Sequence, residues 1–144
     1  MNISSAKTKK FTSIFNRYAM ASALFLALLI SGCKPKYEEA QRQFNQGYYR
    51  QAAVIFEEFS KNTKDKKLKD KAIFMAAEAY RLSDDYDKAN RLYERVLKKD
   101  PKNTKALLMR ANMLKKMELY REAVDAYDTY LQEVPGDTMA DYQK

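Results

Sequence analysis

The feature that most constrains this chain is a set of landmark residues that recurs at an interval of 34 residues. The recurring pairs are Ala77 and Ala111, Tyr86 and Tyr120, Ala89 and Ala123, Tyr93 and Tyr127, and Pro101 and Pro135. Both the small and the aromatic landmarks keep the interval, so the match does not depend on one alignment of alanines. A period of this length predicts a stack of helix pairs, in which each copy supplies two helices and a turn.

A third copy lies upstream, where Ala40, Tyr49, Ala52 and Phe56 precede their counterparts by 37 residues. We expect the three extra residues to form a loop over residues 61–71, which contain six lysines and only two aspartates. A polar insertion of this kind is tolerated between stacked helix pairs. We predict a solvated loop, and the alternative is a contact with anionic lipid headgroups.

Apolar residues recur at three- and four-residue spacing and predict six helices and no strand. Gly47, Pro101 and Pro135 fall in the breaks between these helices, where residues that end a helix are expected. The recurring alanines are small enough to let the two helices of a pair approach closely. The expected helices cover residues 37–46, 49–60, 69–82, 86–98, 104–117 and 120–134.

Together, the period and its landmarks resemble those of tetratricopeptide repeat (TPR) proteins. The resemblance implies an all-α fold, a right-handed TPR superhelix of about three helix-turn-helix repeats. The repeats would cover about residues 37–68, 69–102 and 103–137. Residues 138–144 are expected to form a partial capping helix or to begin a further segment, because a terminal repeat usually needs a polar cap.

The first residues of the chain read as an export signal. Four basic residues precede residues 18–30, an apolar stretch of thirteen that suits a signal peptide and is too short for a membrane-spanning helix. The stretch ends in Ser31-Gly32-Cys33, which resembles a bacterial lipobox, and Cys33 is the only cysteine. We predict a cleaved lipoprotein signal peptide (1–32), lipidation at Cys33 and a tether over 33–36. The alternatives are an ordinary signal peptide with an incidental cysteine, or a retained anchor.

The charge balance does not indicate a nucleic-acid partner. The formal net charge is +8, but four of the 27 basic residues and none of the 19 acidic ones precede Cys33, so the mature value is +4. Basic and acidic residues also alternate along the helices. No histidine is present, and the three glycines form no phosphate-binding pattern. We therefore expect a non-enzyme with no metal, cofactor or small-molecule substrate.

In TPR proteins the concave face is lined mainly by the first helix of each pair, and the resemblance carries this role to matched positions here. Such a face would suit an extended or helical peptide with some acidic residues. The alternative is that these side chains only face solvent or pack on further domains. Some TPR proteins bind a carboxylate through paired Lys and Asn residues on successive first helices. Only Asn112 stands at such a position here, so this clamp is not expected. The candidate residues are Tyr37, Phe44, Phe74, Arg81, Lys105, Leu108, Asn112 and Lys115.

A lipidated cysteine followed at once by TPR repeats resembles a set of outer-membrane lipoproteins. Residues 127–137 and the opening 37–40 look most like the N-terminal TPR region of PorE-like, OmpA-family lipoproteins of Bacteroidota. That resemblance implies a scaffold for protein partners in an envelope machine, the type IX secretion and gliding system. The alternative is a BamD-like accessory of outer-membrane barrel assembly, although five repeats are usual there. A solute or glycan binder is disfavoured because shallow repeats imply no deep pocket.

The residue after the cysteine bears on localisation. Lys34 stands where an aspartate would suggest inner-membrane retention, and residues 34–36 lack the early acidic run of surface-export signals. We therefore predict an outer-membrane lipid anchor with the domain facing the periplasm.

Overall fold

Seven α-helices and no strand make up residues 36–144, the part of the chain that the computed structural model describes. The predicted signal peptide and Cys33 lie outside these residues. The all-α fold expected from the periodicity is confirmed. None of the helices between residues 36 and 144 combines the length and the apolar character needed to cross a membrane. The helices are α2 (Tyr37–Asn45), α3 (Tyr49–Asn62), α4 (Lys66–Leu82), α5 (Tyr86–Leu97), α6 (Thr104–Lys116), α7 (Tyr120–Glu133) and α8 (Thr138–Gln143).

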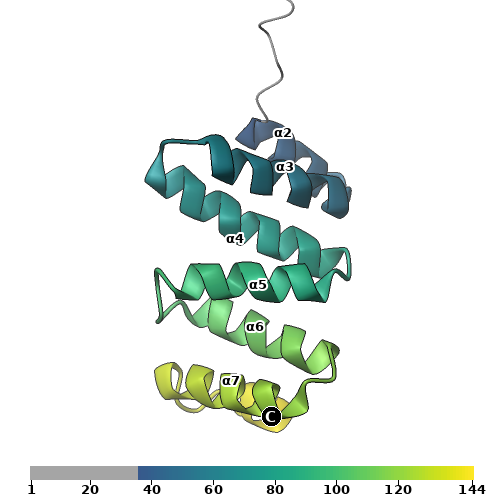
Figure 1. Cartoon of the computed structure of the whole chain (residues 1–144). Helices are drawn as coiled ribbons and strands as arrows, with labels where there is room; N and C mark the ends of the chain where they lie inside the picture. The colour runs from purple at the N-terminus through teal and green to yellow at the C-terminus, as the bar shows by residue number, and fades with distance from the viewer. Residues whose placement is uncertain (1–35) are drawn as a thin grey trace, which may run out of the picture. The chain divides into compact units, whose positions relative to one another are not determined.

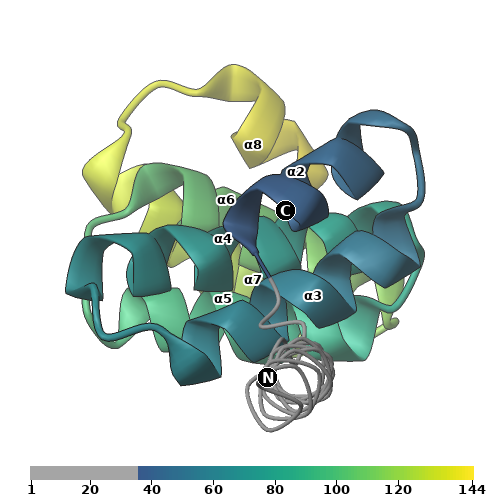
Figure 2. The same cartoon turned by 90° about the horizontal axis from the view of Figure 1, so that it is seen from above.

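The helices are stacked in chain order, and every extensive contact joins two consecutive helices (Figure 1). Viewed along the stack, α2, α4, α6 and α8 lie on one side and α3, α5 and α7 on the other (Figure 2). This arrangement is that of a TPR superhelix, with three helix pairs followed by the single short helix α8. The first helices of the pairs therefore share one face, as the predicted concave surface requires.

Alanines explain how the helices come close enough to stack. The landmark alanines of α2, α4 and α6 and those of α3, α5 and α7 are all buried, with exposed fractions of 3% or less. A methyl side chain at the crossing point lets two helix backbones approach more closely than a longer side chain would. The six are Ala40, Ala77, Ala111, Ala52, Ala89 and Ala123.

One large aromatic ring per pair fills the space between the helices. Phe56, Tyr93 and Tyr127 occupy equivalent positions on α3, α5 and α7 and are fully buried. Burial of a side chain of this size contributes roughly 2–3 kcal/mol through the hydrophobic effect. Among the described residues, the surrounding apolar side chains form two clusters, one centred on α2–α5 and one on α6–α8. Both clusters lie in the compact unit Pro35–Lys144.

The expected loop over residues 61–71 is wrong. Helix α3 continues to Asn62 and α4 begins at Lys66, so only residues 63–65 connect them. The cause is local, because Asp65 caps α4 by accepting hydrogen bonds from the backbone N–H groups of Lys67 and Leu68. Lysine is also a good helix former, so a lysine-rich segment can extend a helix once a cap is present. The extra residues of the first repeat therefore lengthen the helices.

In each of the three pairs, one tight turn joins the two helices. At equivalent positions in these turns, Gly47, Asp84 and Glu118 have φ values of 83°, 59° and 62°. This left-handed conformation costs a glycine little, whereas a residue with a side chain pays about 1 kcal/mol. The second and third repeats therefore keep the turn at some local strain.

The last helix, α8, covers part of the end of the stack. Asp137 caps it by accepting hydrogen bonds from the N–H groups of Met139 and Ala140, each at 3.1 Å. Asp137 also accepts a 2.7 Å hydrogen bond from the Tyr130 hydroxyl of α7, which joins the two helices. Ala140 is buried against the second core cluster, while Tyr142 is 87% exposed. Residues 138–143 thus form a helix, as one of the two expectations for this segment proposed.

Candidate functional site

The eight predicted binding residues all lie on α2, α4 and α6, but they do not form one continuous surface. The aromatic ring of Tyr37 packs on Phe56 and Phe59, with ring centroids 5.2 and 5.7 Å away. Phe44 packs against Tyr49, and Leu108 packs against the second core cluster. These three predicted binding residues therefore bury much of their apolar surface within the stack.

At the middle of the stack, Phe74 and Lys105 cover each other. The Lys105 ammonium lies 4.9 Å from the centre of the Phe74 ring, and its Nζ lies 3.6 Å from a carboxylate oxygen of Glu78. The Phe74 ring also packs edge-on against the ring of Tyr93. A ligand approaching Phe74 would have to displace the lysine side chain and its cation–π contact.

Glu78 organises the polar contacts at this level of the stack. It is only 8% exposed, and it accepts a hydrogen bond from the buried Tyr93 hydroxyl. It also accepts a 3.2 Å hydrogen bond from the Arg81 guanidinium. Burial lowers the pKa of Arg81, but the hydrogen bond and the negative charge of Glu78 outweigh this, so the pKa is raised above its usual value. Glu78 is not among the candidate residues predicted from the sequence, although its spacing from Arg81 is that of a helical ion pair.

The same pairing recurs one repeat later without the charge. Asn112 lies 34 residues after Glu78, and its amide oxygen accepts a hydrogen bond from the Tyr127 hydroxyl, as Glu78 does from Tyr93. Tyr127 is fully buried, and burial raises its pKa. In the first repeat the equivalent aromatic residue is Phe56, which has no hydroxyl. Asn112 is therefore partly committed to holding the α6–α7 pair.

Three predicted residues meet at one pocket near the C-terminal end of the stack. Arg81, Asn112 and Lys115 line this C-terminal pocket, which has a volume of about 610 Å³. Its remaining walls come from α6, from the first residue of α7 and from α8. They are Met109, Met113, Lys116, Tyr120 and Gln143.

The C-terminal pocket offers cations, apolar surface and a free donor. The Nε atom of Arg81 is buried and has no hydrogen-bond partner among the described residues, although the same guanidinium contacts Glu78 through Nη2. Lys115 donates a 2.9 Å hydrogen bond to the backbone carbonyl of Gln143, so α8 helps to shape the pocket. Tyr120 stands at the rim and is 61% exposed. Such a site can accept a carboxylate together with an apolar side chain.

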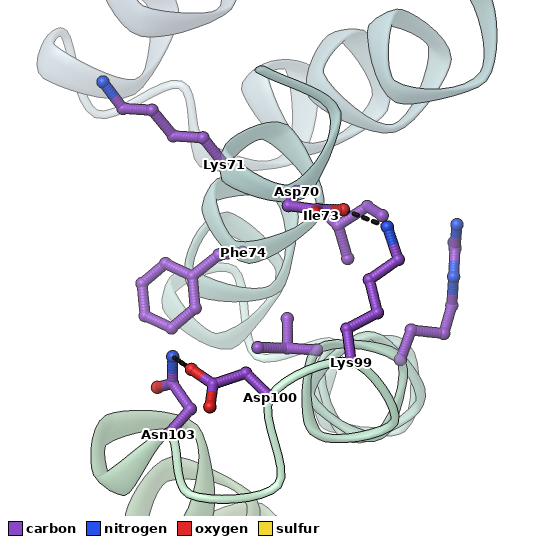
Figure 3. Close-up of a pocket in the computed structure, with 9 residues that line it drawn as sticks. Asp70, Lys71, Ile73, Phe74, Lys99, Asp100 and Asn103 are labelled. Atoms are coloured by element: carbon purple, nitrogen blue, oxygen red, sulfur yellow. Dashed lines mark hydrogen bonds and ion pairs between the residues drawn. The ribbon is translucent and has the colours of Figure 1, made fainter. Parts of the chain in front are cut away.

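A second pocket, of about 440 Å³, lies between the start of α4 and the end of α5 (Figure 3). Ile73, Phe74 and Val96 supply its apolar surface. Several polar groups around it pair with one another: Lys99 contacts Asp70, and the Asn103 side-chain amide donates a 3.1 Å hydrogen bond to Asp100. Its polar walls are thus partly satisfied without a ligand, unlike Arg81 in the C-terminal pocket.

Comparison with known proteins matches part of the chain to a known type of repeat. Residues 80–144, from the end of α4 through α8, match the family model described as Tetratricopeptide repeat. No curated protein matches the chain. One similar solved structure is a protein of Bacteroides ovatus ATCC 8483 to which a protein-binding role is ascribed, with 24% identity and a TM-score of 0.47. The similarity covers 67% of this chain and 54% of that one, so the chain spans about half the length of that protein.

The repeat match and the helix stack agree on the general role. TPR arrays are scaffolds that bind other proteins along a surface built from successive repeats. The repeats therefore indicate a scaffold for protein–protein interaction.

Proposed function

We propose that this chain is a lipid-anchored scaffold of the outer membrane that faces the periplasm and holds protein partners of the type IX secretion and gliding machinery. The TPR stack supports the scaffold role. The lipobox-like sequence ending in Cys33 and the resemblance of residues 127–137 to PorE-like lipoproteins support the anchor and the machine. The partner would bind as an acidic peptide segment in the C-terminal pocket.

The observation that carries the peptide site is the state of Arg81. Arg81 lines the C-terminal pocket, its guanidinium is held by Glu78, and its buried Nε has no hydrogen-bond partner among the described residues. A buried donor without a partner is costly, so a ligand carboxylate that accepts this hydrogen bond gains the full value of satisfying it. Lys115 and Lys116 add positive charge next to it.

The apolar part of the pocket sets a second requirement on the ligand. Met109 and Met113 line the pocket, and methionine side chains adapt to ligands of different shape. Tyr120 provides an exposed aromatic surface at the rim. The preferred segment therefore carries an acidic residue close to an apolar one, within reach of both kinds of wall.

The experiment is site-specific photo-crosslinking in cells that produce the full chain. A photoreactive phenylalanine analogue replaces Tyr120 at the pocket rim, and the control places it at Val54 of α3, which is 51% exposed and lies away from the pocket. We expect position 120 to capture type IX secretion components that position 54 does not. Adding Arg81→Gln should reduce this capture, and Arg50→Gln on α3 should leave it unchanged.

The outcomes separate the possible roles. Capture of the barrel insertase and nascent outer-membrane proteins at position 120 would replace the secretion machine with a BamD-like role. Equal capture at positions 120 and 54 would show that the pocket does not select the partner. Failure of acylated protein to appear in the membrane fraction would refute the lipid anchor, whatever the partner.

A further inference from the structure

The lysines of residues 61–71, the segment predicted to be a loop, belong to a larger basic surface. Linkers 63–65 and 98–103 lie at the same edge of the stack (Figure 1, left). Residues 61–71 and 98–105 meet there and contain ten lysines, no arginine and three aspartates. We call this surface the lysine edge. It consists of Lys61, Lys64, Lys66, Lys67, Lys69, Lys71, Lys98, Lys99, Lys102 and Lys105.

The lysine edge is only partly neutralised by the protein itself. Four of its lysines pair with carboxylates, and six form no ion pair within residues 36–144. The linkers at the opposite edge, 46–48, 83–85 and 117–119, contain three acidic residues and no basic one. Positive charge is therefore concentrated along one side of the stack although the whole chain is only moderately basic. The six are Lys64, Lys66, Lys67, Lys69, Lys71 and Lys98.

The position of these lysines costs the fold some stability. Three of them, Lys66, Lys67 and Lys69, lie in or next to the first turn of α4, and the nearest acidic residue at this helix end is the cap Asp65, because the turn itself contains none. The N-terminus of a helix carries partial positive charge, so cations there are unfavourable by a few tenths of a kcal/mol or more each. Local rules of this kind are usually broken where a surface serves a partner.

We propose that the lysine edge binds the surface of a membrane that contains anionic phospholipid. Juxtaposed lysines are attracted to phosphate-bearing headgroups without needing a fixed arrangement of the anions. Lysine is a flexible, well-hydrated point charge, whereas recognition of a folded acidic partner favours the planar arginine side chain. Residues 61–71 and 98–105 contain no arginine, although Arg95 lines the neighbouring pocket with Lys71 and Lys99. The charges and their spacing along one edge thus suit a fluid anionic surface better than a single protein carboxylate site.

Further features near the lysine edge favour a lipid bilayer as its binding partner. Leu68 lies between Lys67 and Lys69 and is 38% exposed, so an apolar side chain accompanies the lysines, as in segments that lie in a membrane interface. The Lys71 ammonium lies 5.2 Å from the centre of the Tyr37 ring, which places the start of α2 beside the lysine edge. Cys33 is four residues before Tyr37, so at most about 14 Å of chain separates the predicted lipidation site from the start of α2.

The surface is separate from the C-terminal pocket, and the inference does not require the proposed peptide or the lipid. The test uses residues 36–144, which contain both core clusters, with circular dichroism and thermal melting to confirm that each variant is folded. Binding is measured by sedimentation with phosphatidylcholine vesicles that contain either no or about one-third phosphatidylglycerol. We expect binding only to the anionic vesicles, and loss of that binding in high salt because screening shortens the range of the attraction.

Matched variants then locate the binding surface. Lys64→Gln, Lys66→Gln and Lys67→Gln are combined in one protein, and Arg50→Gln, Arg91→Gln and Arg121→Gln in the other, so both lose three exposed positive charges. Each lysine near an anionic surface strengthens binding about fivefold, so the lysine-edge variant should bind about a hundredfold more weakly. The arginine variant should change by only a few-fold.

A fluorescent probe reports the apolar contact. Residues 36–144 contain no cysteine, so Leu68→Cys and Leu119→Cys each create a single labelling site, and the two leucines are equally exposed at 38%. An environment-sensitive dye should shift to shorter wavelength on anionic vesicles at position 68 and not at position 119, which lies in a linker at the opposite edge.

Three results would overturn the proposal. Equal losses in the two triple variants would show that net charge alone causes the binding. Equal binding to neutral and anionic vesicles would show that the headgroup charge is irrelevant. Absence of vesicle binding, combined with binding of poly-glutamate that the lysine-edge variant loses, would assign the surface to an acidic protein instead.

Discussion

The hydroxyl of Tyr93 provides the sharpest test of how the middle of the stack is held together. Tyr93 is fully buried and donates a hydrogen bond to Glu78, which is itself only 8% exposed. Replacing Tyr93 with phenylalanine removes this bond and leaves the ring in place. Water cannot easily replace the lost donor, because neither group has much contact with solvent.

The expected magnitude follows from the charge of the acceptor. A hydrogen bond to a charged group contributes about 1.5–3 kcal/mol to stability. Arg81 and Lys105 still face Glu78 in the variant, so we expect a loss near the lower end, about 1.5–2 kcal/mol in the free energy of unfolding. For a domain of this size, that corresponds to a decrease in melting temperature of roughly 6–8 °C.

The chain contains its own control for this experiment. Tyr127 is the equivalent residue one repeat later and is equally buried, but its hydroxyl donates to the neutral amide of Asn112. Tyr127→Phe should therefore cost only about 1 kcal/mol. Urea unfolding of both variants, followed by circular dichroism at neutral pH, measures the difference. A Tyr93→Phe loss below about 0.5 kcal/mol, or one no greater than that of Tyr127→Phe, would refute the role assigned to Glu78.

Four other predictions concern turns, packing, pH and the last helix. Glu118→Gly should raise the free energy of unfolding by about 0.5–1 kcal/mol in urea titrations, because it relieves a φ of 62°. Ala77→Leu should lower it by about 1–3 kcal/mol, since no space exists at the crossing of α4 with its neighbours. Burial and the negative charge of Glu57 raise the pKa of Tyr80 to about 12. The folded-state pKa of Tyr80 thus exceeds the unfolded value near 10. The stabilisation linked to the protonated Tyr80 hydroxyl is therefore complete below pH 10 and is lost as the pH rises to 12. Tyr80→Phe should flatten that part of a stability–pH curve. Asp137→Ala should abolish amide-exchange protection in α8 while protection in α4 and α5 persists.

The periodic part of the fold could be predicted from the sequence because small residues and one large ring recur at the same interval. Alanines such as Ala77 and Ala111 mark helix crossings wherever the interval is kept. The lysine-rich segment 61–71 was misjudged because its polarity suggested a loop, whereas the cap at Asp65 and the helix propensity of lysine decide its structure. Composition and local structure are separate properties, and here they pointed in different directions.

The candidate site was less predictable because its chemistry depends on contacts between helices. The pairing of Glu78 with Arg81 could have been read from their spacing on one helix. The cover of Phe74 by Lys105 could not, since those residues are 31 positions apart and meet only through the stacking of α4 and α6. Arg81 also presents two different donors, one paired and one unpaired, and a sequence cannot distinguish them.

The consecutive stacking of the helices has a mechanical consequence. A pulling force applied between α2 and α8 passes through each helix interface in turn, since no extensive contact bypasses a neighbour. Every interface then carries the same load, and the weakest yields first. That interface is between α7 and α8, where a helix of six residues buries little more than Ala140. Under tension the stack would therefore release α8 first, at a force that leaves the three helix pairs folded.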